Sequence, residues 1–273
     1  MTTWRNWAGN QVARNLVSSG VVATVEDVVE VVKRARVAGK RVKVVGSGHS
    51  FSGIARPEEV VVSLENLTGV VSVDRERSTV TVWAGTTIAD LNVELHHLGL
   101  AMPNLGDVTY QSIVGALSTA THGTGIRLGG LATQLVAFTL VTSEGEVIEC
   151  SATSHEELWR FGRVSLGAFG IIVDVTLRVV DQFLLHAVEQ AEPVDEVLAN
   201  WERSTQENDH FEFYWIPHTR WALTKRNNRT TNAKTDRRPI STFWNKIVME
   251  NLAFGAVCRV GRAVPALVPK LAT

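Results

Sequence analysis

Two segments in the N-terminal half place apolar side chains at helical spacing. The first, residues 24–39, opens on a Thr-Val-Glu-Asp sequence that resembles a capping box and ends at a glycine. The second, residues 87–99, opens on Thr-Ile-Ala-Asp, places isoleucine and leucine on one face and also ends at a glycine. Shorter helices are predicted at residues 154–159 and from about residue 193 to residue 206.

Short runs of β-branched residues separate these helices and predict strands. Glu144-Gly145 lies between two of the runs, which predicts a hairpin. Helices mixed with hairpin-linked strands indicate an α+β fold. The predicted strands cover residues 41–45, 60–62, 70–73, 79–83, 135–141, 146–150, 171–180 and 210–216.

The pattern changes after Asp181, which predicts two domains, residues 1–180 and residues 181–273. Trp244 to Arg262 are apolar at helical spacing and lie close to the last residue of the sequence. The one strand and two helices predicted in the second domain bury little apolar surface by themselves. We therefore expect this domain to be incomplete, with its remaining partner in another chain or in a longer parent sequence.

Composition narrows the function classes. The chain has 273 residues, of which 45% are hydrophobic and 20% charged, as in soluble globular proteins. Its two cysteines form neither a disulfide framework nor a metal-ligand spacing, so we expect no metal. No apolar run reaches about 18 residues, so no transmembrane segment is predicted. The first residues lack a secretory pattern, and we expect a cytoplasmic protein.

The charge is unevenly distributed along the chain. Residues 1–217 have a net charge of −10, and residues 218–273 have a net charge of +9. A basic end can bind nucleic acid or a membrane surface, or it can balance the acidic part of the same protein. Aromatic and apolar residues are mixed into the basic part, which favours electrostatic balance and no nucleic-acid partner.

Two glycine-rich loops are the candidates for ligand binding. The first, Gly46-Ser47-Gly48-His49-Ser50-Phe51-Ser52-Gly53, follows a predicted strand, and its small residues allow successive backbone N–H groups to face one anion. It is not a dinucleotide fingerprint, because Phe51 stands where the third glycine is needed, and no Gly-Lys-Ser/Thr follows as in a P-loop. A simple turn after a strand is the alternative.

The second loop is Ser118-Thr119-Ala120-Thr121-His122-Gly123-Thr124-Gly125, about 70 residues further along the chain. Neither loop contains lysine or arginine, so backbone and hydroxyl groups would bind a phosphate-bearing ligand. The alternative for this loop is a tight turn with a hydrogen-bonded His122.

Three motifs in order resemble the vanillyl-alcohol-oxidase-type FAD-linked oxidases. They are Val45-Gly46-Ser47-Gly48-His49-Ser50, Thr121-His122-Gly123-Thr124-Gly125 and Ser165-Leu166-Gly167-Ala168-Phe169-Gly170. Asn6-Trp7-Ala8-Gly9 and Phe213-Tyr214-Trp215-Ile216-Pro217-His218-Thr219 are similar to the sugar-lactone and alditol oxidase subgroup, which includes gulonolactone and arabinonolactone oxidases. Each motif alone is weak, whereas the ordered set covers nearly the whole chain.

The resemblance implies a two-subdomain, PCMH-type FAD-binding domain followed by the first part of a substrate (cap) domain with an antiparallel sheet and helices. The first loop would wrap the FAD pyrophosphate and His49 would bond covalently to the flavin, while residues 106–125 would run along the flavin and residues 170–173 would touch its adenine side. The implied cofactor-binding residues are Gly46, Ser47, Gly48, His49, Ser50, Gly106, Ser112, Gly115, Ser118, Thr121, His122, Gly123, Thr124, Gly125, Gly170 and Ile172.

The implied activity is oxidation of a CH–OH group in a sugar lactone or polyol, with hydride passing to flavin N5 and electrons to O2, which yields H2O2. Alternatives are a dehydrogenase that uses another electron acceptor and a truncated, inactive flavin-binding module. Gly106 matches a gate position where glycine admits oxygen, although a turn with positive φ would also require glycine there.

The chain departs from the family pattern in two places. Ala120 stands where glycine is common, and family members continue well beyond residue 273. The charged residues that orient substrate in the family lie in that later part, so no catalytic base is assigned.

Overall fold

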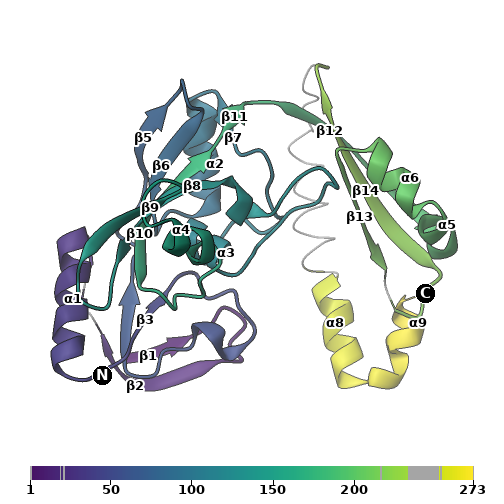
Figure 1. Cartoon of the computed structure of the whole chain (residues 1–273). Helices are drawn as coiled ribbons and strands as arrows, with labels where there is room; N and C mark the ends of the chain where they lie inside the picture. The colour runs from purple at the N-terminus through teal and green to yellow at the C-terminus, as the bar shows by residue number, and fades with distance from the viewer. Residues whose placement is uncertain are drawn as a thin grey trace. The chain divides into compact units, whose positions relative to one another are not determined.

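The chain folds into two compact units, seen in a computed structural model that describes residues 2–18, 20, 22–215, 217–232, 252 and 254–272. One unit comprises Met1–Thr124 and Leu128–Gln182, and the other comprises Gly125–Arg127 and Phe183–Thr273. Each unit has its own sheets and helices (Figure 1).

The first unit begins with a four-stranded sheet in the order β1-β2-β4-β3. β1 and β2 form an antiparallel pair, whereas β2, β4 and β3 run parallel. The connection from β2 to β3 contains α1, in which the N-cap residue Thr24 and Asp27 form a reciprocal capping box. The strands are β1 Thr2–Arg5, β2 Val12–Ser18, β3 Val42–Val45 and β4 Val60–Ser63, and the helix is α1 Val25–Val37.

The rest of the first unit is built on a five-stranded antiparallel sheet in the order β5-β6-β10-β8-β9. β7 and β11 form a separate, two-stranded antiparallel sheet. The strands are β5 Val70–Asp74, β6 Thr79–Trp83, β7 Leu100–Ala101, β8 Leu135–Val141, β9 Val147–Ser151, β10 Ile171–Arg178 and β11 Val180–Asp181.

Two hydrophobic cores hold this unit together. The larger core joins the five-stranded sheet to α2 (Ile88–His97) and α3 (Ile113–Ser118), with Leu91, Leu95 and Ile113 fully buried. The second core joins α1 to β4 and to the ends of β8 and β10. Each fully buried leucine or isoleucine stabilises such a core by about 1.5–3 kcal/mol. The helices therefore fix where the loops between them lie.

The second unit contains a three-stranded antiparallel sheet in the order β12-β14-β13. Val197 of α5 packs with Phe211 and Ala222 from the sheet to form a small core. The elements are β12 Leu184–Pro193, α5 Val194–Ala199, α6 Trp201–Glu207, β13 His210–Trp215, β14 Trp221–Thr230, α8 Phe254–Ala263, the 3₁₀ turn η4 Pro265–Leu267 and α9 Val268–Ala272.

The predicted α+β fold is confirmed, and each predicted helix and strand that lies among the described residues corresponds to an observed element. Two predicted elements were wrong in extent. The strand predicted over 171–180 is two strands, β10 and β11, which belong to different sheets. The helix predicted over 193–206 is two helices that meet at Asn200. The Asn200 amide donates to the Glu196 carbonyl oxygen at 2.8 Å, which ends α5. Of the apolar segment Trp244 to Arg262, residues 244–251 and Ala253 lie outside the described residues, as does Ile216.

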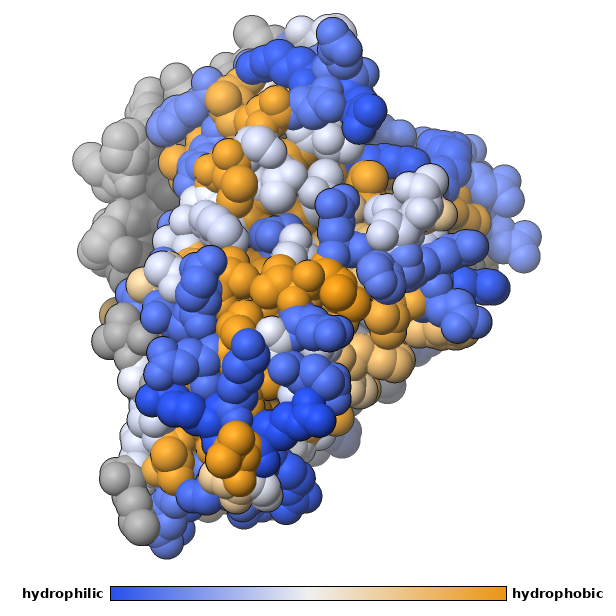
Figure 2. Space-filling model, turned by 60° about the vertical axis from the view of Figure 1, so that its left-hand side comes forward, coloured by the Kyte–Doolittle hydropathy of each residue, from blue (hydrophilic) through white to orange (hydrophobic). Residues whose placement is uncertain are grey.

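The surface mixes hydrophilic and hydrophobic residues. On the face that Figure 2 shows, hydrophobic patches alternate with hydrophilic ones. Within the described part of the chain, no helix combines the length and the apolar character needed to cross a membrane.

Candidate functional site: a cavity between glycine loops

A cavity in the first unit brings together several of the predicted binding residues. Its volume is about 140 Å³, and it is partly open to solvent. The predicted residues that line it are Gly46, Ser47, Gly48, His49, Ser50, Ser112, Gly115, Ser118, Gly170 and Ile172.

The other predicted residues lie outside this lining. Gly106, Thr121, His122, Gly123, Thr124 and Gly125 are absent from the walls of the cavity. The exposed His122 ring instead makes a local contact, in which Nδ1 lies 2.9 Å from the Gly123 carbonyl oxygen. This contact favours the turn interpretation for the His122 side chain.

Small residues are required where the first loop meets α3. A Cβ atom at Gly46 would overlap the Ser112 hydroxyl oxygen, and one at Gly115 would approach the same oxygen to 2.7 Å. Gly48 has φ +69, and a Cβ there would lie 3.4 Å from the Asn6 Cα atom. The loop therefore packs against α3 on one side and the N-terminal segment on the other, and residues of the loop and of α3 line the cavity.

The His49 side chain has a ring nitrogen that is available for bonding to a ligand in the cavity. Its Nδ1 atom is buried and has no hydrogen-bond partner in the described part of the chain. A buried polar atom without a hydrogen-bond partner lowers the stability of a fold by about 1–3 kcal/mol. A ligand that bonds to Nδ1 would remove this cost.

Lys43 and Gln111 also line the cavity, although the sequence motifs did not single them out. The Lys43 ammonium donates to the Leu166 carbonyl oxygen at 3.0 Å, which ties β3 to the Ser165–Gly170 turn. Leu166 has φ +53, a left-handed conformation that is uncommon for leucine. Gln111 Oε1 is buried and has no hydrogen-bond partner among the described residues. Lys43 lies in a strand with alternating polar and apolar residues, where a lysine ordinarily faces solvent. The only sequence feature that could have indicated its role in the site is its position just before the Gly46–Ser50 loop.

The electrostatics of the lining suit an anion. Lys43 is the one lysine or arginine among the lining residues, and none of them is an aspartate or glutamate. Backbone groups of the Gly46–Ser50 loop and the hydroxyls of Ser112 and Ser118 add neutral donors. The residues present therefore fit FAD, which has two phosphates and several hydroxyl groups.

A second contact region joins the segment around Gly106 to the second glycine loop. A Cβ atom at Gly123 would overlap the Leu105 carbonyl oxygen, and one at Gly106 would lie 3.0 Å from the His122 carbonyl oxygen. Gly106 does not have positive φ, so the turn explanation for this glycine is wrong. Close packing against His122 is the physical constraint here.

Ala120 has φ +57, which is the left-handed conformation that glycine adopts most easily. This conformation explains physically why glycine is common at the matching position. Alanine is tolerated there at a cost of about 1–2 kcal/mol.

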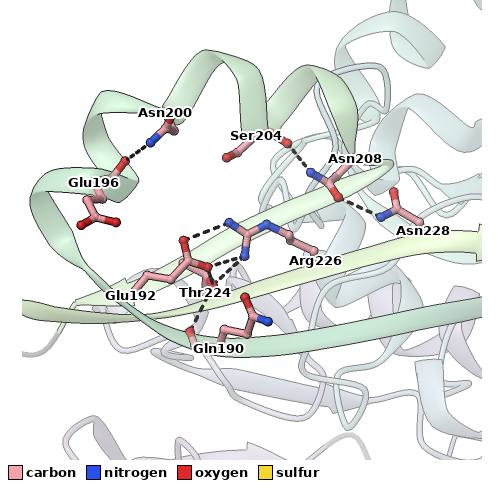
Figure 3. Close-up of polar contacts among 9 residues, drawn as sticks. All are labelled: Gln190, Glu192, Glu196, Asn200, Ser204, Asn208, Thr224, Arg226 and Asn228. Carbon is pink, nitrogen blue, oxygen red and sulfur yellow. Dashed lines mark hydrogen bonds and ion pairs between the residues drawn. The ribbon is translucent and has the colours of Figure 1, made fainter.

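The second unit has a polar network beneath α5 and α6 (Figure 3). Glu192 accepts hydrogen bonds from Thr224 Oγ1 and from Arg226 Nη1, each at 2.6 Å. The hydrogen bond from Arg226 is the main reason that the pKa of Glu192 lies below its ordinary value. The Glu192 carboxylate therefore links β12 to β14 through side-chain hydrogen bonds. The described residues contain no group of three or more side chains suited to hold a metal ion.

Comparison with known proteins supports the same interpretation. The family model described as FAD binding domain matches residues 21–151, and the model described as D-arabinono-1,4-lactone oxidase matches residues 175–273. An L-gulono-1,4-lactone dehydrogenase of Mycobacterium tuberculosis is 37% identical over 98% of this chain and 61% of its own length. An L-gulonolactone oxidase of Scyliorhinus torazame is 39% identical over 81% of this chain and 50% of its own length.

The chain thus spans between half and two thirds of the length of these two relatives. Among solved structures, cholesterol oxidase from B. sterolicum superposes with a TM-score of 0.83 over 99% of this chain and 56% of its own, at 20% identity. That likeness concerns the fold. Together, the two family models and the identity to both relatives show that the chain joins a segment similar to the FAD binding domain family to a segment similar to the D-arabinono-1,4-lactone oxidase family.

Proposed function

We propose that this chain binds FAD in the cavity between the Gly46–Ser50 loop and α3, and forms the flavin-bearing part of a sugar-lactone or polyol oxidoreductase. The observation that supports it most is the convergence of two separate glycine- and serine-rich segments on one cavity without carboxylates. On this proposal residues 1–180 are the FAD-binding domain and residues 181–273 begin the substrate domain. The division of the chain after Gln182 supports that boundary.

His49 is the proposed site of covalent attachment. Its place in the cavity wall supports this role, as does its buried Nδ1 atom, which has no hydrogen-bond partner within the described ranges of the chain. His49 would hold the flavin through a bond from an imidazole nitrogen to the C8α carbon; one proton would leave each partner, and the two electrons would pass to O2, which with two protons would give H2O2. The chain's part is to hold the ring and exclude competing groups.

The bound flavin would supply the redox chemistry by accepting hydride from a carbinol carbon and passing electrons to an acceptor. The residues of this chain bind and orient it: Lys43 and the serine hydroxyls hold the phosphate and sugar portion, and Gln111 Oε1 accepts a hydrogen bond. The relatives are named both as oxidase and as dehydrogenase. Gly106 favours O2 as the acceptor.

The proposal is tested by reconstituting the chain with FAD and precipitating it with acid. Yellow protein with bands near roughly 370 and 450 nm shows flavin binding, and flavin that stays in the pellet is covalently held. The His49→Ala variant is expected to bind flavin but to release all of it in acid. The His122→Ala and His97→Ala variants serve as matched controls and are expected to retain it.

Colourless wild-type protein at saturating FAD would contradict flavin binding altogether. Flavin released from the wild-type protein by acid would contradict covalency alone. Bleaching of the 450 nm band (an approximate flavin value) by L-gulono-1,4-lactone, D-arabinono-1,4-lactone or an alditol under anaerobic conditions then identifies the substrate class.

Lys43→Met is expected to weaken reversible FAD binding about tenfold, because it removes both a cation and the tie to Leu166. The measurement is an FAD titration followed by flavin fluorescence in the His49→Ala background, where binding is reversible. Lys40→Met is the matched control, since Lys40 is an exposed lysine that does not line the cavity. Equal dissociation constants for the two variants would remove Lys43 from the site.

A further inference from the structure

The short turn between β1 and β2 packs against the Gly46–Ser50 loop, which contains His49. Asn6 is 3% exposed, and its side-chain amide donates to the Ser50 carbonyl oxygen at 2.9 Å. The backbone N–H of Trp7 donates to the Gly48 carbonyl oxygen at 2.8 Å. The Asn10 amide donates to the Phe51 carbonyl oxygen at 2.9 Å. Hydrogen bonds therefore join this turn to the loop on both sides of His49.

The turn is itself rigidly closed around Asn6. Asn6 Oδ1 accepts from the Gln11 backbone N–H at 2.9 Å, and the Asn6 amide also donates to Asn10 Oδ1 at 2.7 Å. The polar atoms of the buried Asn6 side chain all have hydrogen-bond partners, and these bonds hold the turn in one conformation.

Trp7 lies on this turn and touches the His49 ring directly. The two ring centroids are 5.4 Å apart with an interplanar angle of 25°, which is a stacked arrangement. Trp7 is 67% exposed, which is unusual for so large a side chain, and its ring also contacts the Phe51 ring edge-on at a centroid distance of 6.2 Å. His49 Nδ1 has no hydrogen bond among the described residues, so no such bond to that nitrogen orients the imidazole.

We infer that Trp7 is a positioning residue that holds the His49 imidazole at the orientation in which one ring nitrogen joins the flavin. This inference rests on the proposed covalent attachment at His49. The bond forms between that nitrogen and the flavin C8α carbon, with one proton lost from each and two electrons passed through the flavin to O2. Trp7 takes no part in these transfers, and it narrows the range of ring orientations before the bond forms.

The test follows the rate at which acid-stable flavin appears after apo-protein is mixed with excess FAD. Trp7→Leu keeps an apolar side chain but removes the aromatic face, and it is expected to slow incorporation about five- to tenfold. Trp7→Phe restores a face and is expected to incorporate flavin within about twofold of the wild-type rate. Trp221→Ala removes another exposed tryptophan, 56% exposed, and is expected to leave the rate unchanged.

Flavin bound before acid treatment is measured in the same samples by gel filtration, together with thermal unfolding. The inference requires Trp7→Leu to bind as much flavin as the wild type while attaching it slowly. An unchanged rate in Trp7→Leu overturns it. Equal loss of total flavin in Trp7→Leu and Trp7→Phe also overturns it, since Trp7 would then only support the loop fold. Wild-type protein that binds FAD without any acid-stable fraction refutes the attachment at His49 itself.

Discussion

Replacing Gly123 with alanine is expected to lower the free energy of unfolding by about 3 kcal/mol, even in protein that contains no FAD. A Cβ atom at Gly123 would overlap the Leu105 carbonyl oxygen and the Asn104 side-chain oxygen, and it would lie 2.9 Å from the Leu105 carbonyl carbon. Two of these contacts are with backbone atoms, which cannot rotate away as a side chain can. The chain must therefore separate the Asn104–Gly106 segment from the second glycine loop.

Thermal unfolding of the apo-protein, followed by circular dichroism, measures this effect. A loss of about 3 kcal/mol corresponds to a fall in Tm of roughly 10 °C for a protein of this size. Gly130→Ala is the matched control, because its Cβ atom would meet the Thr121 carbonyl oxygen at an ordinary 3.4 Å. A Gly123→Ala variant as stable as this control would show that the two segments are not packed as described.

The second large effect concerns reoxidation of the flavin. On the proposal that Gly106 is the oxygen gate that the resemblance implies, Gly106→Ala is expected to slow the reaction of reduced, bound flavin with O2 by about tenfold or more, because an added methyl group would narrow the path of O2 to the flavin. The added methyl would lie 3.0 Å from the His122 carbonyl oxygen and 3.4 Å from Thr121 Cγ2, so it fits with a shift of a few tenths of an ångström. The fold and the flavin should therefore be retained.

The measurement reduces the bound flavin with stoichiometric dithionite and mixes it with aerated buffer in a stopped-flow instrument. Recovery of the 450 nm band (approximate flavin value) gives the reoxidation rate without any substrate. Gly130→Ala adds a methyl group against the same Thr121–His122 segment and should reoxidise like the wild type. Wild-type rates in fully flavinylated Gly106→Ala protein would exclude Gly106 as the gate.

Local sequence signals predicted most elements of the first unit, but not β1, β2, β7 or α3. The capping box at Thr24 and Asp27 starts α1, and the hairpin at Glu144-Gly145 joins β8 to β9. β12 was not predicted, because its ten residues are mostly exposed and carry no clean alternation. It exists because β14 pairs with it along its whole length, and such long-range pairing has no local signature.

The residues of the candidate site likewise fall into those that sequence motifs predicted and those that only the structure reveals. The motif order pointed to the Gly46–Ser50 loop, but only the fold shows that α3 and the Ser165–Gly170 turn complete the cavity. Lys43 and Gln111 belong to no motif, and their contribution depends on three-dimensional proximity. In the motif that contains His122 and Gly123, close packing against Leu105 by itself requires glycine at position 123.

Peptide mass mapping after FAD reconstitution tests the central claim most directly. Trypsin cleaves after Lys43, so His49 lies in a peptide that begins at Val44. We expect that peptide, and no other, to gain the mass of the flavin, and His49→Ala protein to yield no flavin-bearing peptide. Flavin on another peptide, or a protein that takes up no flavin at saturating FAD, would contradict the account.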